Sequence, residues 1–188
     1  MAGKRNQGSR KENQIKEKEK DKSILVLGIG NPILTDDAVG ILVVRELHNI
    51  DADVEEAAIG GMSLLDLILG YDTVIIVDAV KSPSKEKGRK SNEKGKGKKM
   101  PGTVSILQEH EIKRALHASS THDVSFSEAL ELGRNLFPDE MPSTIIVIGI
   151  EVQDTETFSE IPTEPVRNAI PEAARMITEL AETLRSHP

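Results

Sequence analysis

The sequence predicts a single α/β domain with a mostly parallel sheet that helices cover on both faces. Short continuous apolar runs, typical of strands buried on both faces, alternate with segments whose apolar residues recur at helical spacing. Strands that alternate with helices in this way favour parallel pairing. The length of 188 residues suits one domain with tails rather than two domains.

The first half of the chain predicts the order β-α-β-α-β. The proposed first helix has an acidic pair at its start, which favours the positive end of a helix dipole. The expected elements are a strand over 24–29 (ILVLGI), a helix over roughly 36–48, a weaker strand near 53–59, a helix near 62–70 and a strand over 73–79 (TVIIVDA).

The second half continues the alternation after a low-complexity stretch. The expected elements are a strand over 103–108 (TVSILQ), helices near 110–117 and 123–137, a strand over 144–152 (TIIVIGIEV) and an amphipathic helix over about 164–185. The pattern does not specify the order of the strands. An edge strand or the last strand can run antiparallel to the others.

Two basic segments are attached to an acidic body. The chain carries a net charge of −7, yet residues 1–22 hold eight basic and four acidic side chains, and residues 81–100 hold nine and two. Both segments lack apolar periodicity, so neither buries enough surface to offset its ordering entropy. We expect a disordered basic head over 1–22, a domain over 23–188, and a Lys-rich flexible loop over 81–100.

Composition excludes several classes of protein. The absence of Cys excludes a disulfide framework, a thiolate metal site and a Cys nucleophile. No apolar run is long enough to span a membrane and no signal peptide precedes the domain, so we expect a cytoplasmic protein. With no Trp, one Tyr and three Phe, single-stranded nucleic acid would find few stacking platforms.

Polar residues gather where the predicted strands end, the edge at which open α/β sheets bind ligands. Asp36 and Asp37 follow the first strand, Asp78 directly follows a buried apolar run, and His122 precedes a helix beyond the fourth strand. Carboxylates and an imidazole without sulfur suit a divalent metal such as Ni, Zn or Mn, with coordination positions left open.

Each of these features also has a structural interpretation. The Gly28-Ile29-Gly30-Asn31 turn lacks the third glycine of a dinucleotide fingerprint, so a tight turn is favoured over a phosphate cradle. Asp36 and Asp37 are also suited to capping a helix. Asp78 at the end of a buried strand needs a partner or a function, although capping the following loop would suffice.

Other catalytic motifs are missing. The HExxH zinc signature is absent, since Arg114 stands where the second His would be, and no G-x-S-x-G nucleophile elbow is present. Serine-hydrolase chemistry therefore has no support. The remaining histidines are interpreted as surface or tail residues: His48, His110, His117 and His187.

Taken together, ILVLGIGNPILTDDAVG, VIIVDAV, PGTVSIL and STHDVS resemble the NiFe-hydrogenase maturation endopeptidases. The similarity covers about residues 23–185 apart from the Lys-rich loop. It implies a five-stranded α/β/α sandwich and a cytoplasmic protease that removes a C-terminal extension from the hydrogenase large-subunit precursor after nickel insertion.

The resemblance also assigns a metal-contacting and catalytic triad. By motif the triad falls on Asp37, Asp78 and His122. In this family it is thought to recognise nickel already seated in the precursor, so the metal belongs to the substrate and we expect no tightly bound cofactor. Water activation by the metal and general-base catalysis by a free aspartate are both open.

The chain departs from the family pattern in several places. Asp37 replaces the longer Glu of some relatives, and Ala38 stands where many have Gly. The segment 56–61 lacks the Asp-Gly-Gly-Thr pattern thought to touch substrate, which leaves the preferred precursor open. The Lys-rich loop begins three residues after Asp78, close enough to guide an acidic partner.

Two other functions compete with the protease. A non-catalytic binding module would hold a nucleotide, phosphate or metal at the first turn, but Asp36 and Asp37 would repel a phosphate there. Nucleic acid could associate with the two basic segments, but the acidic body opposes it and we expect no such partner. We expect the hydrogenase large-subunit precursor as the partner, no membrane, and a monomer.

Overall fold

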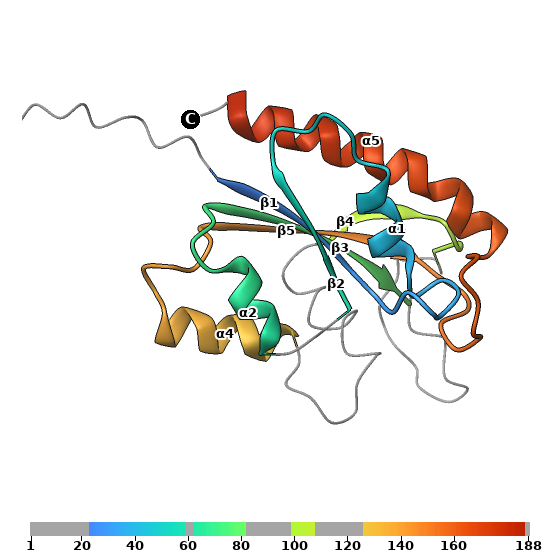
Figure 1. The fold of residues 1–188 in the computed structure, drawn as a ribbon, viewed down its shortest axis with the longest axis horizontal. Coiled ribbons are helices and arrows are strands. Elements are labelled where there is room, and N and C mark those ends of the chain that lie inside the picture. The colour runs from blue at the N-terminus through green and yellow to red at the C-terminus, as the bar shows by residue number, and fades with distance from the viewer. Residues whose placement is uncertain (1–22, 59–61, 82–98, 108–125, 187–188) are drawn as a thin grey trace, which may run out of the picture.

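The computed structural model describes residues 23–58, 62–81, 99–107 and 126–186 (Figure 1). The expected basic head, most of the Lys-rich loop and the expected helix near 110–117 lie outside the described residues.

The centre of the fold is a five-stranded sheet in the order β2-β1-β3-β5-β4. All neighbours pair in parallel except β4, which lies at an edge and runs antiparallel to β5. The predicted mostly parallel sheet is confirmed, and the antiparallel strand lies at an edge. The strands are β1 (Ile24–Ile29), β2 (Asp53–Ala57), β3 (Thr73–Val80), β4 (Val104–Leu107) and β5 (Thr144–Glu151).

Helices cover both faces of this sheet, as predicted (Figure 1). α1 and α5 pack on one face, and α2 and α4 pack on the other. The molecule is therefore a three-layer α/β/α sandwich. The helices are α1 (Val39–Arg45), α2 (Ser63–Ile68), α4 (Phe126–Leu136) and α5 (Glu164–Ser186).

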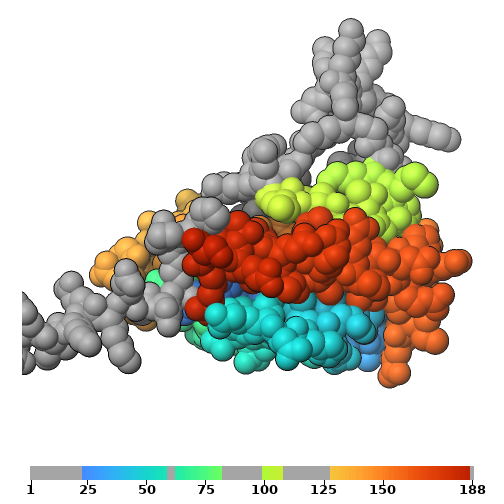
Figure 2. All heavy atoms as spheres, turned by 90° about the horizontal axis from the view of Figure 1, so that it is seen from above, coloured from blue at the N-terminus to red at the C-terminus, as the bar shows by residue number. Residues whose placement is uncertain are grey.

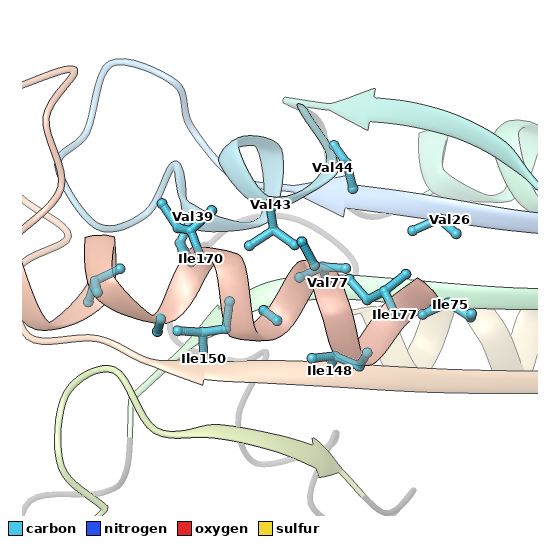
Figure 3. Packing of buried hydrophobic residues seen from close by; sticks show 14 of the residues in the cluster. Val26, Val39, Val43, Val44, Ile75, Val77, Ile148, Ile150, Ile170 and Ile177 are labelled. Atoms are coloured by element: carbon cyan, nitrogen blue, oxygen red, sulfur yellow. The ribbon is translucent and has the colours of Figure 1, made fainter. Parts of the chain in front are cut away.

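The central strands are apolar on both faces because each face has its own core. Along β1, Ile24 and Val26 point into the core under α1 and α5, whereas Leu25 and Leu27 point into the core under α2 and α4. Figure 3 shows the first of these cores, where Ile177 of α5 lies close to the strands. This two-sided burial explains the continuous apolar run in the sequence.

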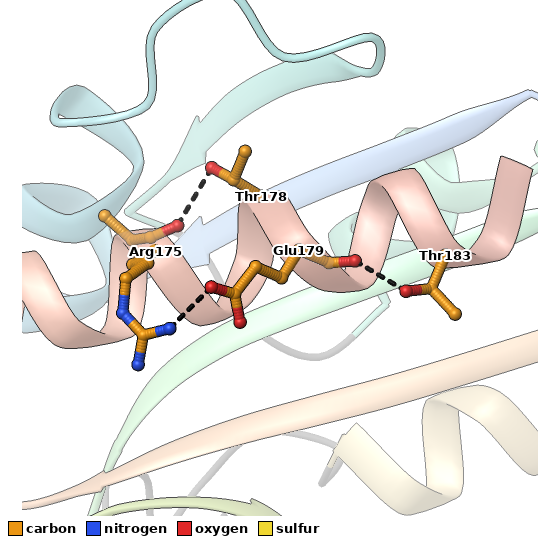
Figure 4. Close-up of polar contacts among 5 residues, drawn as sticks. Arg175, Thr178, Glu179 and Thr183 are labelled. Carbon is orange, nitrogen blue, oxygen red and sulfur yellow. Dashed lines mark hydrogen bonds and ion pairs between the residues drawn. The ribbon is translucent and has the colours of Figure 1, made fainter.

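The outer face of α5 meets solvent, which confirms an amphipathic helix. Arg175 and Glu179 form an exposed ion pair at 2.5 Å, one turn apart (Figure 4). The hydroxyls of Thr178 and Thr183 donate to the carbonyls of Ala174 and Glu179. Such exposed pairs stabilise a helix by only about 0.3–0.5 kcal/mol, so burial of the inner face holds α5 in place.

The first helix is shorter than predicted. It begins at Val39, three residues later than the expected start at Asp36. The Asp36 N–H donates to the carbonyl of Asp154 at 2.9 Å, so residue 36 is held in a loop that contacts the segment after β5. Within the described residues, no helix combines the length and apolar character that crossing a bilayer requires.

Candidate active site

The strand order places the loops after β1 and β3 side by side at the carboxyl edge of the sheet. β1 lies between β2 and β3 in the sheet. The connection after β1 therefore runs to β2 on one side, and the connection after β2 crosses back to β3 on the other side. In open α/β sheets, ligands bind at such a reversal of strand order. Asp37 follows β1, and Asp78 lies two residues before the end of β3.

Glycines bring the start of α1 against the ends of these two strands. A Cβ on Gly40 would lie 2.3 Å from the carbonyl oxygens of both Ile29 and Val77, and a Cβ on Gly28 would lie 2.4 Å from the carbonyl oxygen of Gly40. No side chain fits at such distances. Because Val77 precedes Asp78, this close packing sets Asp37 next to the Asp78 carboxyl group.

The turn after β1 holds the Asp37 carboxylate. The Asn31 N–H donates to Asp37 Oδ2 at 3.0 Å, and Asn31 Oδ1 accepts from the Ile33 N–H at 3.2 Å. Gly30 has φ 153°, and a Cβ there would lie 2.0 Å from the Asp37 carbonyl oxygen. The tight-turn interpretation of this glycine motif is confirmed, and the turn directs its Asn31 amide to a carboxylate of the chain itself.

The two consecutive aspartates have different partners. Asp36 is fully buried, and its carboxylate accepts hydrogen bonds from the amides of Gln153, Asp154 and Thr163 and from the Thr163 hydroxyl, at 2.7 to 3.2 Å. The N-cap of α1 is Ala38, with no side-chain capping bond. The capping interpretation is therefore wrong for both aspartates. Asp36 holds the loop between β5 and α5 by hydrogen bonds, whereas the Asp37 carboxylate accepts from the Asn31 N–H and its charge acts on Asp78.

The pKa values of the Asp37 and Asp78 carboxyls are both raised. The pKa of Asp78 is raised to about 8, mainly by burial and further by the negative charge of Asp37, while the hydrogen bond from the Ala79 N–H at 2.8 Å opposes the shift. Burial also raises the pKa of Asp37, while the Asn31 N–H and the charge of Lys81 act in the opposite direction. Asp78 therefore holds its proton at neutral pH, and a bound cation would displace it.

Lys81 belongs to this site, although the sequence placed it in the flexible loop over 81–100. Its Nζ donates to the Thr155 hydroxyl at 2.6 Å, which joins the end of β3 to the loop after β5. Its positive charge acts on Asp37. The sequence does not predict either contact, because Lys81 looks like the first residue of the basic run that follows it.

The structure brings together two of the three predicted site residues. Asp37 and Asp78 are close enough for the charge of one to raise the pKa of the other. His122 lies outside the described residues. In the part of the chain that the structure describes, no group of three or more His, Cys, Asp or Glu side chains could hold a metal ion.

Comparison with known proteins identifies the family. The family model for hydrogenase maturation protease matches residues 96–180. Hydrogenase 2 maturation protease of Escherichia coli K12 is 32% identical over 139 residues, which cover 71% of this chain and 75% of the relative. The hydrogenase expression/formation protein HoxM of Azotobacter vinelandii is 28% identical over 168 residues, which cover 85% and 73%.

Solved structures show the same likeness. The E. coli hydrogenase maturating endopeptidase HybD superposes with a TM-score of 0.66 at 26% identity, over 86% of this chain and 93% of that one. An endopeptidase from E. coli gives 0.59 at 27% identity, over 82% and 89%. By fold and by these likenesses the protein is a peptide-bond hydrolase. It belongs to the hydrogenase maturation protease family, and the resemblance found in its sequence is confirmed.

Proposed function

We propose that the chain is an endopeptidase that removes the C-terminal extension of a NiFe-hydrogenase large-subunit precursor after nickel insertion. The observation that carries the proposal is the pair of carboxyls, Asp37 and Asp78, at the carboxyl edge of the sheet, close enough for the charge of Asp37 to raise the pKa of Asp78. The names of the relatives, hydrogenase maturation proteases, support the choice of substrate.

The donor set suits nickel that the precursor carries. Asp37 and Asp78 supply carboxylate oxygens, and the resemblance assigns His122 as the third group. Two carboxylates and one imidazole leave coordination positions for ligands from the precursor. Without a metal, Asp78 keeps a proton at neutral pH, so a free cation must first displace it. Such a site favours a metal delivered by a bound protein over one taken from solution.

Two routes would activate the attacking water. A nickel ion acidifies a water that it binds, and a carboxylate of the site, once deprotonated, accepts a proton as a general base. In the metal-free protein, the Asp78 pKa of about 8 lies near the working pH expected of such a base. A metal bound directly to Asp78 would keep it deprotonated and leave proton transfer to another group.

A non-catalytic nucleotide or phosphate module fits the geometry less well. Anion binding at a glycine turn uses free backbone N–H groups. The Asn31 N–H at this turn already donates to Asp37, and a phosphate would meet that negative charge. The Asp37 carboxylate therefore occupies the turn and would repel a phosphate or nucleotide there.

Cleavage of a hydrogenase large-subunit precursor, prepared with and without nickel, tests the proposal. We expect intact-mass spectrometry to show loss of a C-terminal peptide from the nickel-loaded precursor only. Asp37→Asn and Asp78→Asn should each abolish the cleavage, whereas Asp66→Asn on the exposed face of α2 should leave it unchanged. Equal cleavage of the metal-free precursor would contradict nickel recognition, and full activity of either site variant would remove that residue from the site.

A further inference from the structure

The loop after β1 and the loop after β5 form one hydrogen-bonded unit next to the site (Figure 1). Leu34 and Phe158 form an antiparallel bridge. The Thr35 N–H donates to the Thr157 carbonyl at 3.0 Å, and the Ser159 N–H donates to the Ile33 carbonyl at 3.1 Å. With the four hydrogen bonds to Asp36, these contacts fix the backbone of both loops. We call residues 31–37 and 153–163 the loop pair.

The loop pair exposes three large apolar side chains. Ile33 is 53% exposed, Phe158 is 77% exposed and Ile161 is 65% exposed. Figure 2 shows the second loop, in orange, projecting at one end of the molecule. Single apolar side chains on a surface are ordinary, but Phe158 and Ile161, three residues apart on one hydrogen-bonded loop, together indicate a contact surface. Aromatic side chains in particular supply much of the energy of protein contacts.

The second loop and the first turn of α5 carry mostly acidic side chains: Asp154, Glu156, Glu160 and Glu164. Lys81, which donates to Thr155, adds one positive charge at the site end of this loop. A partner that buries the apolar side chains therefore needs apolar groups together with basic ones. A second copy of this chain is a poor match, because its body outside the basic segments is strongly acidic.

The basic segments of the chain itself also match poorly. Residues 1–22 contain only Met1, Ala2 and Ile15 as apolar side chains, and residues 82–98 contain none apart from Pro83. These segments offer charge but little to bury against Phe158 and Ile161. The occupant is thus a different protein.

The loop pair is continuous with the candidate site. Asp37 ends the first loop, and Thr155 in the second loop accepts the hydrogen bond from Lys81. A peptide that lies across the loop pair therefore contacts loops that also carry Asp37 and hold Lys81. In a protease, the protein that must reach the reacting groups is the substrate, so the partner of the loop pair is the substrate.

We propose that the loop pair is the docking surface for the C-terminal segment of the precursor, an apolar segment with basic residues. Phe158 and Ile161 bind its apolar side chains, and the carboxylates of the second loop bind its basic groups. This inference rests on the proposed function, from which the identity of the partner is taken.

The affinity of surface variants for the nickel-loaded precursor tests the proposal. All variants are compared in an Asp78→Asn background, which prevents turnover, with the precursor immobilised. We expect Phe158→Ser combined with Ile161→Ser to weaken binding at least tenfold, and 500 mM NaCl to weaken binding of the parent protein. The control is Leu136→Ser on α4, a residue 57% exposed on a helix that packs on the face of the sheet opposite α5, which should change the affinity less than twofold. With Asp78 intact, the loss should fall in KM rather than kcat.

The outcomes separate the docking surface from the proposed function. Unchanged affinity of the double variant, in a protein that still cuts the precursor, overturns the docking surface and leaves the function standing. Binding that depends on Phe158, without cleavage by the parent protein, overturns the function and supports the surface. A protein that neither binds nor cuts overturns both. A dimer in sedimentation that the double variant abolishes would assign the surface to a second copy and overturn the proposal.

Discussion

Gly40 lies directly against the carbonyl of Val77, the residue that precedes Asp78, and a Cβ on Gly40 would lie 2.3 Å from that oxygen. This contact couples the position of α1 to the end of β3. The geometry of the Asp37 and Asp78 carboxyls therefore depends on a residue that bears no functional group.

Gly40→Ala should destabilise the protein and abolish cleavage. Alanine is favoured over glycine in a helix by about 1 kcal/mol, but the new methyl group would press on two backbone oxygens that cannot move independently. We expect a net loss of about 1–3 kcal/mol in urea unfolding. Gly133→Ala on α4 is the control, because its Cβ would meet the flexible ends of Met141 and Leu65 and should cost less. A Gly40→Ala variant as stable as the parent would refute the close-packing explanation.

Asp36→Asn should be more destabilising than its conservative appearance suggests. All four donors around the carboxylate need acceptors, and either orientation of an amide turns an NH₂ group towards at least one of them. We expect a loss of about 2–4 kcal/mol, since buried donors left without acceptors cost about 1–3 kcal/mol each. Thr163→Val, which removes only the hydroxyl, should cost about 1 kcal/mol. Equal losses for the two variants in chemical unfolding would argue against this role of Asp36.

The Asp78 carboxyl should make the stability of the metal-free protein decrease with rising pH. Its pKa is about 8 in the folded protein and near 3.8 in the unfolded chain, so between these values the folded state binds the extra proton. The stabilisation is fully present below about pH 4 and is lost as the pH rises through about 8. Asp78→Asn should flatten the profile over this range, with Asp66→Asn as the control. Parallel profiles for the parent and Asp78→Asn in urea unfolding would disprove the shift.

Lys81→Met should raise the pKa of Asp37. Burial already raises that pKa, and the positive charge of Lys81 opposes the effect, so its removal leaves burial less compensated. The ¹³C chemical shift of the Asp37 carboxyl, followed by NMR against pH, measures the change. Lys81→Arg should restore the parental titration. Lys99→Met is the matched control, since Lys99 also donates to a hydroxyl, that of Ser105. An Asp37 titration that Lys81→Met leaves in place would exclude this electrostatic role.

The fold was predictable because its signals are local and repeated. Apolar runs such as residues 24–29 and 73–79 indicated buried strands, and their alternation with helical patterns indicated parallel pairing. The position of Asp37 and Asp78 followed from the rule that ligands bind where parallel strands end. The strand order was not predictable, since it depends on pairing between segments distant in sequence.

The errors share a physical cause, which is contact between distant segments. Asp36 resembled a helix cap because its hydrogen-bond donors lie 117 to 127 residues away, and no local pattern encodes them. Lys81 looked like part of a solvated basic run because Thr155 is 74 residues distant. In both cases, the loop after β5 supplies the partner and decides the role.

The burial of Asp36 also constrains how the substrate preference of such a protease can be altered. Its one carboxylate ties the backbone of residues 153, 154 and 163 to the turn before α1, so the two loops cannot be exchanged separately without leaving hydrogen bonds unmade. A graft that transfers specificity from a relative must therefore carry both loops together with the aspartate between them. In this fold, the two loops and Asp36 therefore have to change together when substrate preference changes.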